Sequence, residues 1–347
     1  MSIKRIKTKK FPEYDRHESV TRIENRELGV VGFIAVHRRK GENPSLGATR
    51  LWSYGEESEA LRDALRLSWL MSYKSAFAEL PYGGAKAALV LRGEMPDREE
   101  LFAWYAEAVN SLKGKFVTGS DVGVSPQDVE RMRAGSRFII GNGVPAEHYT
   151  AVGVVKSIEA ALEAVYGSPA IQGRTFAVQG LGKTGLGLVR LLYPHAKKIT
   201  VSDVSPEKLQ DARKEFPQLV FEEPSRIHQA EADVFSPCAL HHSVNARTVK
   251  ELHCRAVVGS ANNQLESAQV GEELHARGIL YAPDYVANNG GLISVADQYA
   301  GGTHDDARIM RQIEHSQEKL KGILVESKAT GTPPVTLADR HAASMLA

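Results

Sequence analysis

The sequence predicts an α/β protein with two domains, one of which contains a doubly wound parallel sheet. The chain has 347 residues, more than the roughly 100–200 residues of a usual domain. After about Thr150, short apolar segments alternate with helix-length stretches, which is typical of a parallel sheet with helical crossovers. We expect residues 1–149 to form a first α/β domain and residues 150–325 the doubly wound domain. Residues 326–347 should return to the first domain, and a cleft should separate the two.

In the first domain the apolar pattern changes along the chain. Residues 29–37 are β-branched and aromatic and predict a strand, which a turn at 41–44 follows. Apolar residues recur on one face over 57–71 and predict an amphipathic helix, and a second helix is expected over 97–112. Ser125, followed by a proline and an acid, predicts the N-terminus of a third helix.

In the second domain, short apolar segments predict the strands of the parallel sheet. These segments are residues 175–179, 199–202, 233–236, 256–259 and 279–281. A long amphipathic helix is expected over 305–328.

The composition excludes several classes of protein. With 42% hydrophobic and 24% charged residues, the chain resembles ordinary globular proteins and not disordered or fibrous ones. The net charge of +1 gives no overall positive field that would attract nucleic acid or an anionic membrane surface. The sequence contains no run of about 18 apolar residues that would predict a membrane span. Cys238 and Cys254 are too few for a disulfide framework, which favours the cytoplasm. We expect small molecules and copies of the chain itself as partners.

A glycine-rich turn follows the segment 175–179. Gly180, Gly182 and Gly185 fit the pattern GxGxxG between a strand and a helix, where the three glycines allow a tight turn, close approach of a pyrophosphate, and packing of the helix on the strand. Asp203 ends the next strand at about the spacing at which a carboxylate binds the ribose hydroxyls. This acid would repel a 2′-phosphate, so we expect a Rossmann-type domain that binds NAD. The expected cofactor residues of the turn are Gly180, Leu181, Gly182, Lys183, Thr184 and Gly185.

Two lysines and one acid of the first domain are candidates for chemistry. Lys74 and Lys86 both lie in apolar sequence, although two lysines near a glycine turn can also form a solvated face. An ammonium group held in apolar surroundings pairs with an anion or loses its proton. Asp121 belongs to residues 116–123, which predict a strand that ends just before the third helix, although an acid at the end of a strand can also serve only as a cap.

Longer runs of residues carry a family resemblance. They are residues 46–50 (LGATR), 59–67 (EALRDALRL), 71–74 (MSYK), 83–86 (GGAK), 119–123 (GSDVG), 180–185 (GLGKTG), 236–240 (SPCAL), 259–265 (GSANNQL), 281–286 (YAPDYV) and 290–297 (GGLISVAD). In this order they resemble the amino-acid dehydrogenases of the glutamate, leucine, phenylalanine and valine dehydrogenase superfamily. The similarity is greatest to the leucine/phenylalanine (or tryptophan) dehydrogenase-like branch.

The resemblance implies reversible oxidative deamination of an L-amino acid to a 2-oxo acid and ammonia with NAD, by a homo-oligomer. Lys74 matches the lysine that binds the substrate carboxylate. Lys86 matches the lysine that activates the attacking water, and Asp121 matches the carboxylate that exchanges protons with the amino group. The first domain would then be the substrate and oligomerisation domain. Further cofactor contacts are implied for Thr150, Ala239, Ala261 and Asn262, and a contact with the substrate amino group for Asn263.

Other positions bear on the substrate or depart from the family pattern. The substrate-binding positions implied by the resemblance are Leu46, Gly47, Met71, Gly119, Leu292 and Val295, which are apolar or small. They favour a hydrophobic amino acid over glutamate, and Gly119 suggests space for an aromatic side chain. Ala85 and Glu147-His148-Tyr149 replace the usual family residues. Asn288-Asn289-Gly290 replaces the commoner Asn-Ala-Gly, and the extra amide of Asn289 could be a caged polar group or a substrate contact. Adjacent histidines, His241 and His242, would point to opposite faces of a strand, so we expect no metal site.

Two other functions stay open at this point. The chain could be a reductive amination enzyme of secondary metabolism that acts on aromatic 2-oxo acids. It could also be a non-catalytic dinucleotide-binding sensor, although Lys74, Lys86 and Asp121 are all present.

Overall fold

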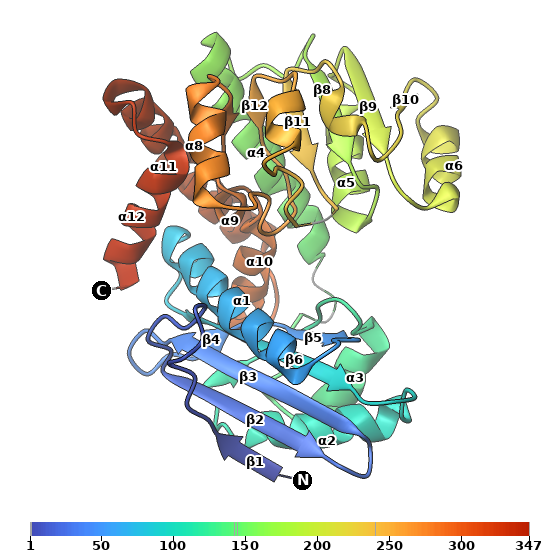
Figure 1. Cartoon of the computed structure of the whole chain (residues 1–347), viewed down its shortest axis with the longest axis vertical. Helices are drawn as coiled ribbons and strands as arrows, with labels where there is room; N and C mark the ends of the chain where they lie inside the picture. The colour runs from blue at the N-terminus through green and yellow to red at the C-terminus, as the bar shows by residue number, and fades with distance from the viewer. Residues whose placement is uncertain (1, 142, 144, 240, 347) are drawn as a thin grey trace. The chain divides into compact units, whose positions relative to one another are not determined.

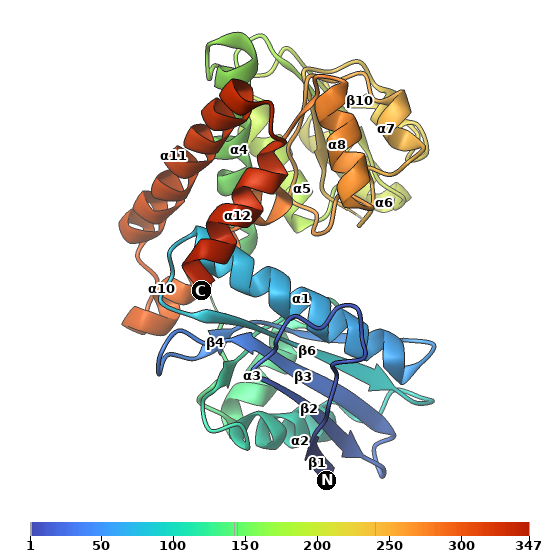
Figure 2. The same ribbon diagram turned by 60° about the vertical axis from the view of Figure 1, so that its left-hand side comes forward.

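The computed structural model describes residues 2–141, 143, 145–239 and 241–346. The chain divides into two compact units (Figures 1 and 2). The first comprises the described residues of 1–144, 295–305 and 342–347, and the second those of 145–294 and 306–341. None of the helices in the described chain is long and apolar enough to cross a membrane.

The C-terminal part of this division differs from the domain boundaries that we expected. Residues 326–341 belong to the second unit, and only the last few residues belong to the first. The reason is the long helix α11 (Asp306–Thr330), which packs along α4 (Ala146–Tyr166). Ser157 of α4 donates a hydrogen bond to Gln317 Oε1 of α11 at 2.8 Å.

The first unit contains a mixed sheet in the order β1-β2-β3-β6-β4-β7, with β5 also paired to β6. The strands are β1 (Ser2–Arg5), β2 (Ser19–Asn25), β3 (Val30–Arg38), β4 (Ser45–Leu46), β5 (Thr49–Trp52), β6 (Gly83–Leu91) and β7 (Phe116–Val117). Strands β1, β2, β3 and β6 are antiparallel neighbours, whereas β4 and β5 run parallel to β6. Lys86, one of the residues expected to carry the chemistry, lies within the central strand β6.

Helices cover both faces of this sheet, because side chains of a strand alternate between its two faces. Val31, Phe33 and Ala35 of β3 pack against α1 (Glu57–Phe77). Val30 and Ile34 contribute to the opposite core, which α2 (Arg98–Asn110) and α3 (Pro126–Gly135) cover. Figures 1 and 2 show α1 on one side of the sheet and α2 and α3 on the other.

The expected elements of the first unit are confirmed, with changes in length. The helix expected over 57–71 continues to Phe77, which brings Lys74 into its last turn. The third helix begins after Ser125, whose side chain accepts from the N–H of Asp128 in a capping box. The strand expected after residue 116 is only the pair Phe116–Val117.

The second unit contains a parallel sheet in the order β10-β9-β8-β11-β12-β13, which confirms the doubly wound parallel sheet that the sequence predicts. The strands are β8 (Thr175–Gln179), β9 (Lys198–Ser202), β10 (Val220–Phe221), β11 (Val234–Pro237), β12 (Ala256–Val257) and β13 (Leu280–Tyr281). The remaining helices are α5 (Lys183–Leu192), α6 (Pro206–Glu215), α7 (Thr248–Glu251), α8 (Ala268–Ala276), α9 (Asp284–Ala287), α10 (Gly290–Gly301), α12 (Pro334–Leu346) and the short 3-10 turn η1 (Ile227–Gln229).

Candidate active site

The glycine-rich turn joins β8 to α5, and each of its glycines has a distinct environment. Gly180 has φ +97°, and a Cβ there would lie 2.6 Å from the Cβ of Ala239. A Cβ at Gly185 would lie 2.0 Å from the carbonyl oxygen of Gly180, so the helix can pack on the turn only without a side chain. A Cβ at Gly182 would meet nothing within 4 Å. The open side of the turn at the N-terminus of α5 fits the pyrophosphate of a dinucleotide.

Asp203 lies directly after β9 and is bound to this turn. Its Oδ2 accepts from the N–H of Leu181 at 2.7 Å, and its Oδ1 accepts from the N–H of Ser205 at 2.9 Å. These bonds hold the carboxylate beside the turn, with further lone pairs left for ribose hydroxyls. Lys208 Nζ lies 3.6 Å from Asp203 Oδ2, so a cation stands next to the acid that was expected to exclude a 2′-phosphate.

The other residues expected at the cofactor lie on several elements of the second unit. Thr150 is on α4, where its hydroxyl donates to the carbonyl of Ala146 at 2.8 Å. Ala239 packs against the turn at Gly180, and the N–H of Ala261 donates to the carbonyl of Pro237 at 2.9 Å. Leu240, at the end of the expected run 236–240, lies outside the described residues.

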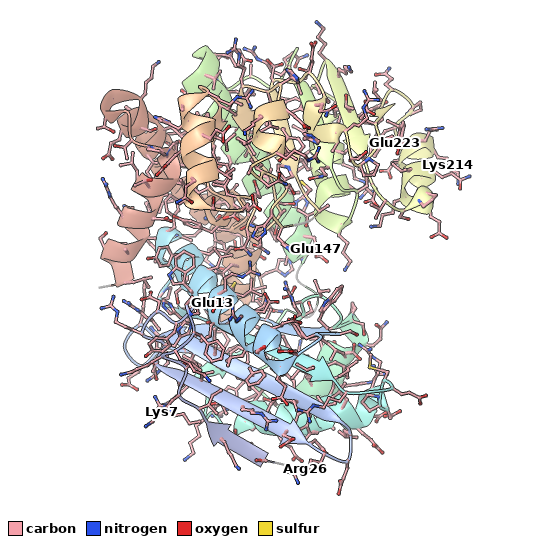
Figure 3. The ribbon with its side chains drawn as sticks, viewed as in Figure 1. Lys7, Glu13, Arg26, Glu147, Lys214 and Glu223 are labelled. Carbon is pink, nitrogen blue, oxygen red and sulfur yellow. The ribbon has the colours of Figure 1, made fainter. Side chains whose placement is uncertain are left out.

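The run Glu147-His148-Tyr149, which departs from the family pattern, lies in the first turn of α4. Figure 3 labels Glu147 there. Glu147 accepts from Lys183 Nζ of the glycine-rich turn at 2.8 Å. Burial raises the pKa of Glu147, but the hydrogen bond and charge of Lys183 outweigh it and the pKa is lowered. The Tyr149 hydroxyl donates to Asp306. This run therefore connects α4 to the nucleotide turn and to α11.

Asn262 and Asn263 lie in a loop whose conformation is stabilised by hydrogen bonds. Asn263 has φ +52°, a conformation that asparagine tolerates better than most residues, and its carbonyl accepts from the N–H of His242 at 2.7 Å. Asn288 Nδ2 donates to Asn262 Oδ1 at 2.9 Å. Asn289 Nδ2 donates to Ser316 Oγ at 2.6 Å and is fully buried. The second amide of this pair is therefore held inside the protein.

The candidate chemistry of the first unit centres on a lysine and a carboxylate. Lys86 is on β6 and shares its face with Ala88, which packs against α1. Lys86 Nζ lies 2.5 Å from Asp121 Oδ2. Both side chains are largely buried, at 8% and 19% exposure. The structure thus brings together two of the three residues that were expected to carry the chemistry.

Arg50 of β5 is a third member of this group, to which the sequence analysis assigned no role. Its Nε lies 3.3 Å from Asp121 Oδ2, and its guanidinium donates to Asp63 Oδ2 at 2.8 Å. Burial raises the pKa of Asp121, but the charges of Lys86 and Arg50 outweigh it and the net pKa is lowered. Arg50 therefore helps to keep Asp121 ionised. Its place in the run 46–50, between the buried Thr49 and Leu51, was the available signal.

Asp63 fixes the other side of Arg50. This α1 carboxylate accepts from the Tyr54 hydroxyl at 2.9 Å and from Arg66 at 2.8 Å. Its pKa is lowered, because the charge of Arg50 and the hydrogen bonds outweigh its burial. A continuous set of charge-assisted contacts therefore runs from α1 through Arg50 to the Lys86–Asp121 pair.

Glycines bring α1 against β6 close to Lys86. A Cβ at Gly84 would lie 2.0 Å from the backbone nitrogen of Ser72, and one at Gly83 would lie 1.5 Å from the carbonyl oxygen of Arg38. Lys74 lies one helical turn from Met71, on the part of α1 that this contact positions, and is buried with 8% exposure. Gly84 therefore has a packing role that brings α1 and β6 together, whereas Gly83 lets β6 approach the end of β3.

Leu46 and Gly47 lie at the adjoining strand β4. Leu46 is buried. A Cβ at Gly47 would lie 2.0 Å from the carbonyl oxygen of Ala85, so the two backbones touch. Ala85, which replaces a family glycine, is fully buried, and its side chain joins the core on the α2 side of the sheet.

Local packing explains why position 119 is a glycine, and the sequence did not reveal this reason. A Cβ there would lie 2.7 Å from the carbonyl oxygen of Ile140, a backbone atom. The space beside its α-carbon is therefore occupied by the protein itself. The remaining expected substrate positions, Leu292 and Val295, lie one turn apart on α10.

The histidine pair is arranged differently from our expectation. His241 and His242 lie in a turn and not on a strand, and their rings contact each other at a centroid distance of 5.0 Å. Among the residues that the structure describes, no group of three or more His, Cys, Asp or Glu side chains is placed to hold a metal ion.

The fold and the sites define a two-domain, NAD(P)-dependent dehydrogenase. The family model described as "Glu/Leu/Phe/Val dehydrogenase, dimerisation domain" matches residues 17–137, and the one described as "Glutamate/Leucine/Phenylalanine/Valine dehydrogenase" matches residues 206–332. The chain therefore belongs to the Glu/Leu/Phe/Val dehydrogenase family, whose members are oxidoreductases that act on amino acids. This confirms the resemblance described above.

Relatives and solved structures agree with this assignment. The chain is 39% identical to an L-tryptophan dehydrogenase of Nostoc punctiforme, over 94% of this chain and 92% of that protein. It is 34% identical to a leucine dehydrogenase of Thermoactinomyces intermedius (95% and 90%) and 36% identical to a phenylalanine dehydrogenase of Caldalkalibacillus thermarum (94% and 91%). The crystal structure of the Nostoc punctiforme L-tryptophan dehydrogenase matches with a TM-score of 0.80 at 36% identity, covering 95% of this chain and 96% of that one.

Proposed function

We propose that the chain catalyses the NAD-dependent, reversible oxidative deamination of a hydrophobic L-amino acid to the 2-oxo acid and ammonia. The observation that carries the proposal is the buried Lys86–Asp121 pair, with its contact of 2.5 Å, on the face of β6 that packs against α1. A lysine and a carboxylate in contact can move protons to and from a substrate. Family membership supports the reaction class.

Each residue of the first unit has a proposed role. Lys74 would bind the substrate carboxylate, and Asp121 would accept a proton from the substrate ammonium group. When bound, NAD would accept the hydride of the α-carbon. Lys86 would act as the base that takes a proton from the water that adds to the resulting iminium carbon. Asp121 would return its proton to the amino group of the carbinolamine, and the C–N bond would break as the carbinolamine hydroxyl releases its proton to solvent, leaving the 2-oxo acid and ammonia. Arg50 is a positioning residue, because it contacts Asp121 and Asp63.

The proposed substrate has a neutral, hydrophobic side chain. The positions implied for its pocket, Leu46, Gly47, Met71, Gly119, Leu292 and Val295, provide no cation for a second carboxylate. Relatives named for tryptophan, leucine and phenylalanine support this class of substrate. The close contact at Gly119 removes the main reason for preferring an aromatic one, so we propose hydrophobic amino acids in general.

Asp203 supports NAD as the proposed cofactor. Its carboxylate is held beside the glycine-rich turn and would repel a 2′-phosphate. Lys208, at 3.6 Å, offsets part of that charge. We therefore propose that NADP is used more weakly than NAD but is not fully rejected.

The assembly and compartment are also proposals. The match of residues 17–137 to a dimerisation domain supports a homo-oligomer. Cys238 and Cys254 are free thiols, as expected in the cytoplasm.

Lys86→Ala tests the reaction. NADH formation with leucine, phenylalanine and tryptophan should fall by a factor of about 10² or more, since a positioned proton-transfer group contributes about 10²–10⁴-fold. NADH binding, followed by fluorescence, should persist, and Lys115→Ala, at an exposed lysine of the same unit, should keep normal activity. Near-normal kcat in Lys86→Ala would refute the role of Lys86. Absence of turnover by the unaltered protein in both directions, with NADH bound, would favour a dinucleotide sensor.

A further inference from the structure

An open cavity of about 930 Å³ lies in the second unit, away from the glycine-rich turn. Thr175, Lys198 and Ile279, which begin or precede the strands β8, β9 and β13, line it. The cavity therefore lies at the amino ends of the parallel strands, whereas the glycine-rich turn follows the carboxyl end of β8. The five residues of β8 separate the two edges by about 13 Å.

The lining of this cavity is mainly basic. Its permanent cations are Lys197, Lys198, Arg255 and Arg277, and its carboxylates are Glu231 and Asp233. His253 also lines the cavity. Positive charge therefore exceeds negative charge in an opening of a chain whose net charge is only +1.

Asp233 is committed to the protein itself and offsets little of that charge. Its Oδ2 accepts from the N–H and the hydroxyl of Thr175, at 2.8 and 2.9 Å, and its Oδ1 accepts from the Tyr166 hydroxyl. Arg174 lies 3.9 Å from the same carboxylate. Burial raises the pKa of Asp233, but these contacts outweigh it and the pKa is lowered. Asp233 thus has a structural role at the junction of β8, β11 and α4.

Three of the four cations have no such structural role. Helix C-termini attract basic side chains, and this explains Arg277, which caps α8 and donates to the carbonyl of Leu252 at 3.0 Å. Lys198 begins β9, and Lys197 and Arg255 precede strands. All three are exposed, and none forms an ion pair with a carboxylate among the described residues. Cations gathered around one opening repel each other, and an anionic ligand would relieve that repulsion.

We propose that this cavity binds a small polyanion that carries two or more phosphate or carboxylate groups. The buried side chains of Leu252, Cys254 and Ile279 provide an apolar floor, so the cations at the rim would contact the charged groups of the ligand. The site is separate from the proposed coenzyme site and does not depend on the proposed reaction.

Isothermal titration calorimetry of the full chain with pyrophosphate, and separately with citrate, tests this site. Both ligands are titrated with and without saturating NADH. The charge-reversal variant Lys198→Glu/Arg255→Glu is compared with Lys214→Glu/Lys328→Glu, which changes the charge equally at exposed positions outside the cavity. Figure 3 shows Lys214 on α6. The neutral variant Lys198→Gln/Arg255→Gln removes the same two charges without reversing them, so it still tests the site if the reversed charges cause misfolding.

We expect saturable binding of at least one ligand, with a dissociation constant below about 1 mM, that is unaffected by NADH and weakens with salt. Binding should weaken at least about tenfold in the reversal variant, by a smaller factor in the neutral variant, and not in the control. Pyrophosphate binding alone would identify phosphates as the ligand class, and citrate binding alone would identify carboxylates. No saturable binding up to about 10 mM, binding abolished by NADH, or equal affinity in all variants would overturn the proposal.

Discussion

Gly119→Ala distinguishes a glycine that widens a substrate pocket from one that lets two backbone segments meet. A Cβ at this position would lie 2.7 Å from the carbonyl oxygen of Ile140, whereas ordinary contacts of a Cβ begin at 3.4 Å. The segments must therefore separate by about 0.7 Å. The φ angle of Gly119 is not in the left-handed region, so backbone strain contributes nothing.

The expected cost follows from this overlap. Added methyl groups in packed sites destabilise proteins by about 1–3 kcal/mol. At about 2–4 °C per kcal/mol for domains of this size, the melting temperature should fall by roughly 2–12 °C. Because Gly119 lies two residues before Asp121, the displacement should also disturb the contact with Lys86 and lower kcat for every substrate alike.

The assay is kcat/KM for leucine, phenylalanine and tryptophan, measured by NADH formation, together with thermal unfolding. The ratio between substrates should stay within about threefold of its original value. Gly322→Ala is the matched control, because a Cβ there meets nothing within 4 Å and alanine is a better helix former than glycine. A selective loss for the aromatic substrates of about tenfold or more, with normal stability, would refute this reasoning and restore Gly119 as a pocket residue.

Three further predictions concern the second unit. Asp203→Ala should weaken NADH binding and reduce the difference in affinity between NADH and NADPH, both measured by fluorescence titration. Unchanged NADH affinity would mean that another acid binds the ribose hydroxyls. Glu147→Gln should release Lys183 and tighten NADH binding by about two- to fivefold at low salt, and weaker binding would contradict this. Burial is the main reason that the pKa of Asp339 is raised to about 6, above its usual 3.8. The protonated side chain therefore contributes to the stability of the folded protein below about pH 4, and this contribution is lost as the pH rises through 6. Asp339→Asn should therefore raise the melting temperature relative to the unaltered protein more at pH 7.5 than at pH 5, whereas a constant difference would exclude this titration.

The sequence predicted the doubly wound sheet well because its signals are local. The segment 175–179 is a strand with the expected bounds, and the glycine pattern after it forms the expected turn. Ser125 caps its helix as predicted, because the capping bonds join residues that are three apart. Short strands such as β4 and β5 were not predicted, because they are stabilised by β6 rather than by a pattern of their own.

By itself the sequence determined the family, the doubly wound class of the nucleotide unit and the residue types able to perform amino-acid chemistry, because each depends on short motifs and hydrophobic periodicity. Only the tertiary structure decided that Arg50 contacts Asp121, that Glu147 pairs with Lys183, and that Gly119 adjoins the carbonyl of Ile140. These contacts join residues from separate strands, helices and loops. Their distances depend on how those elements pack, and no local pattern in the chain contains that information.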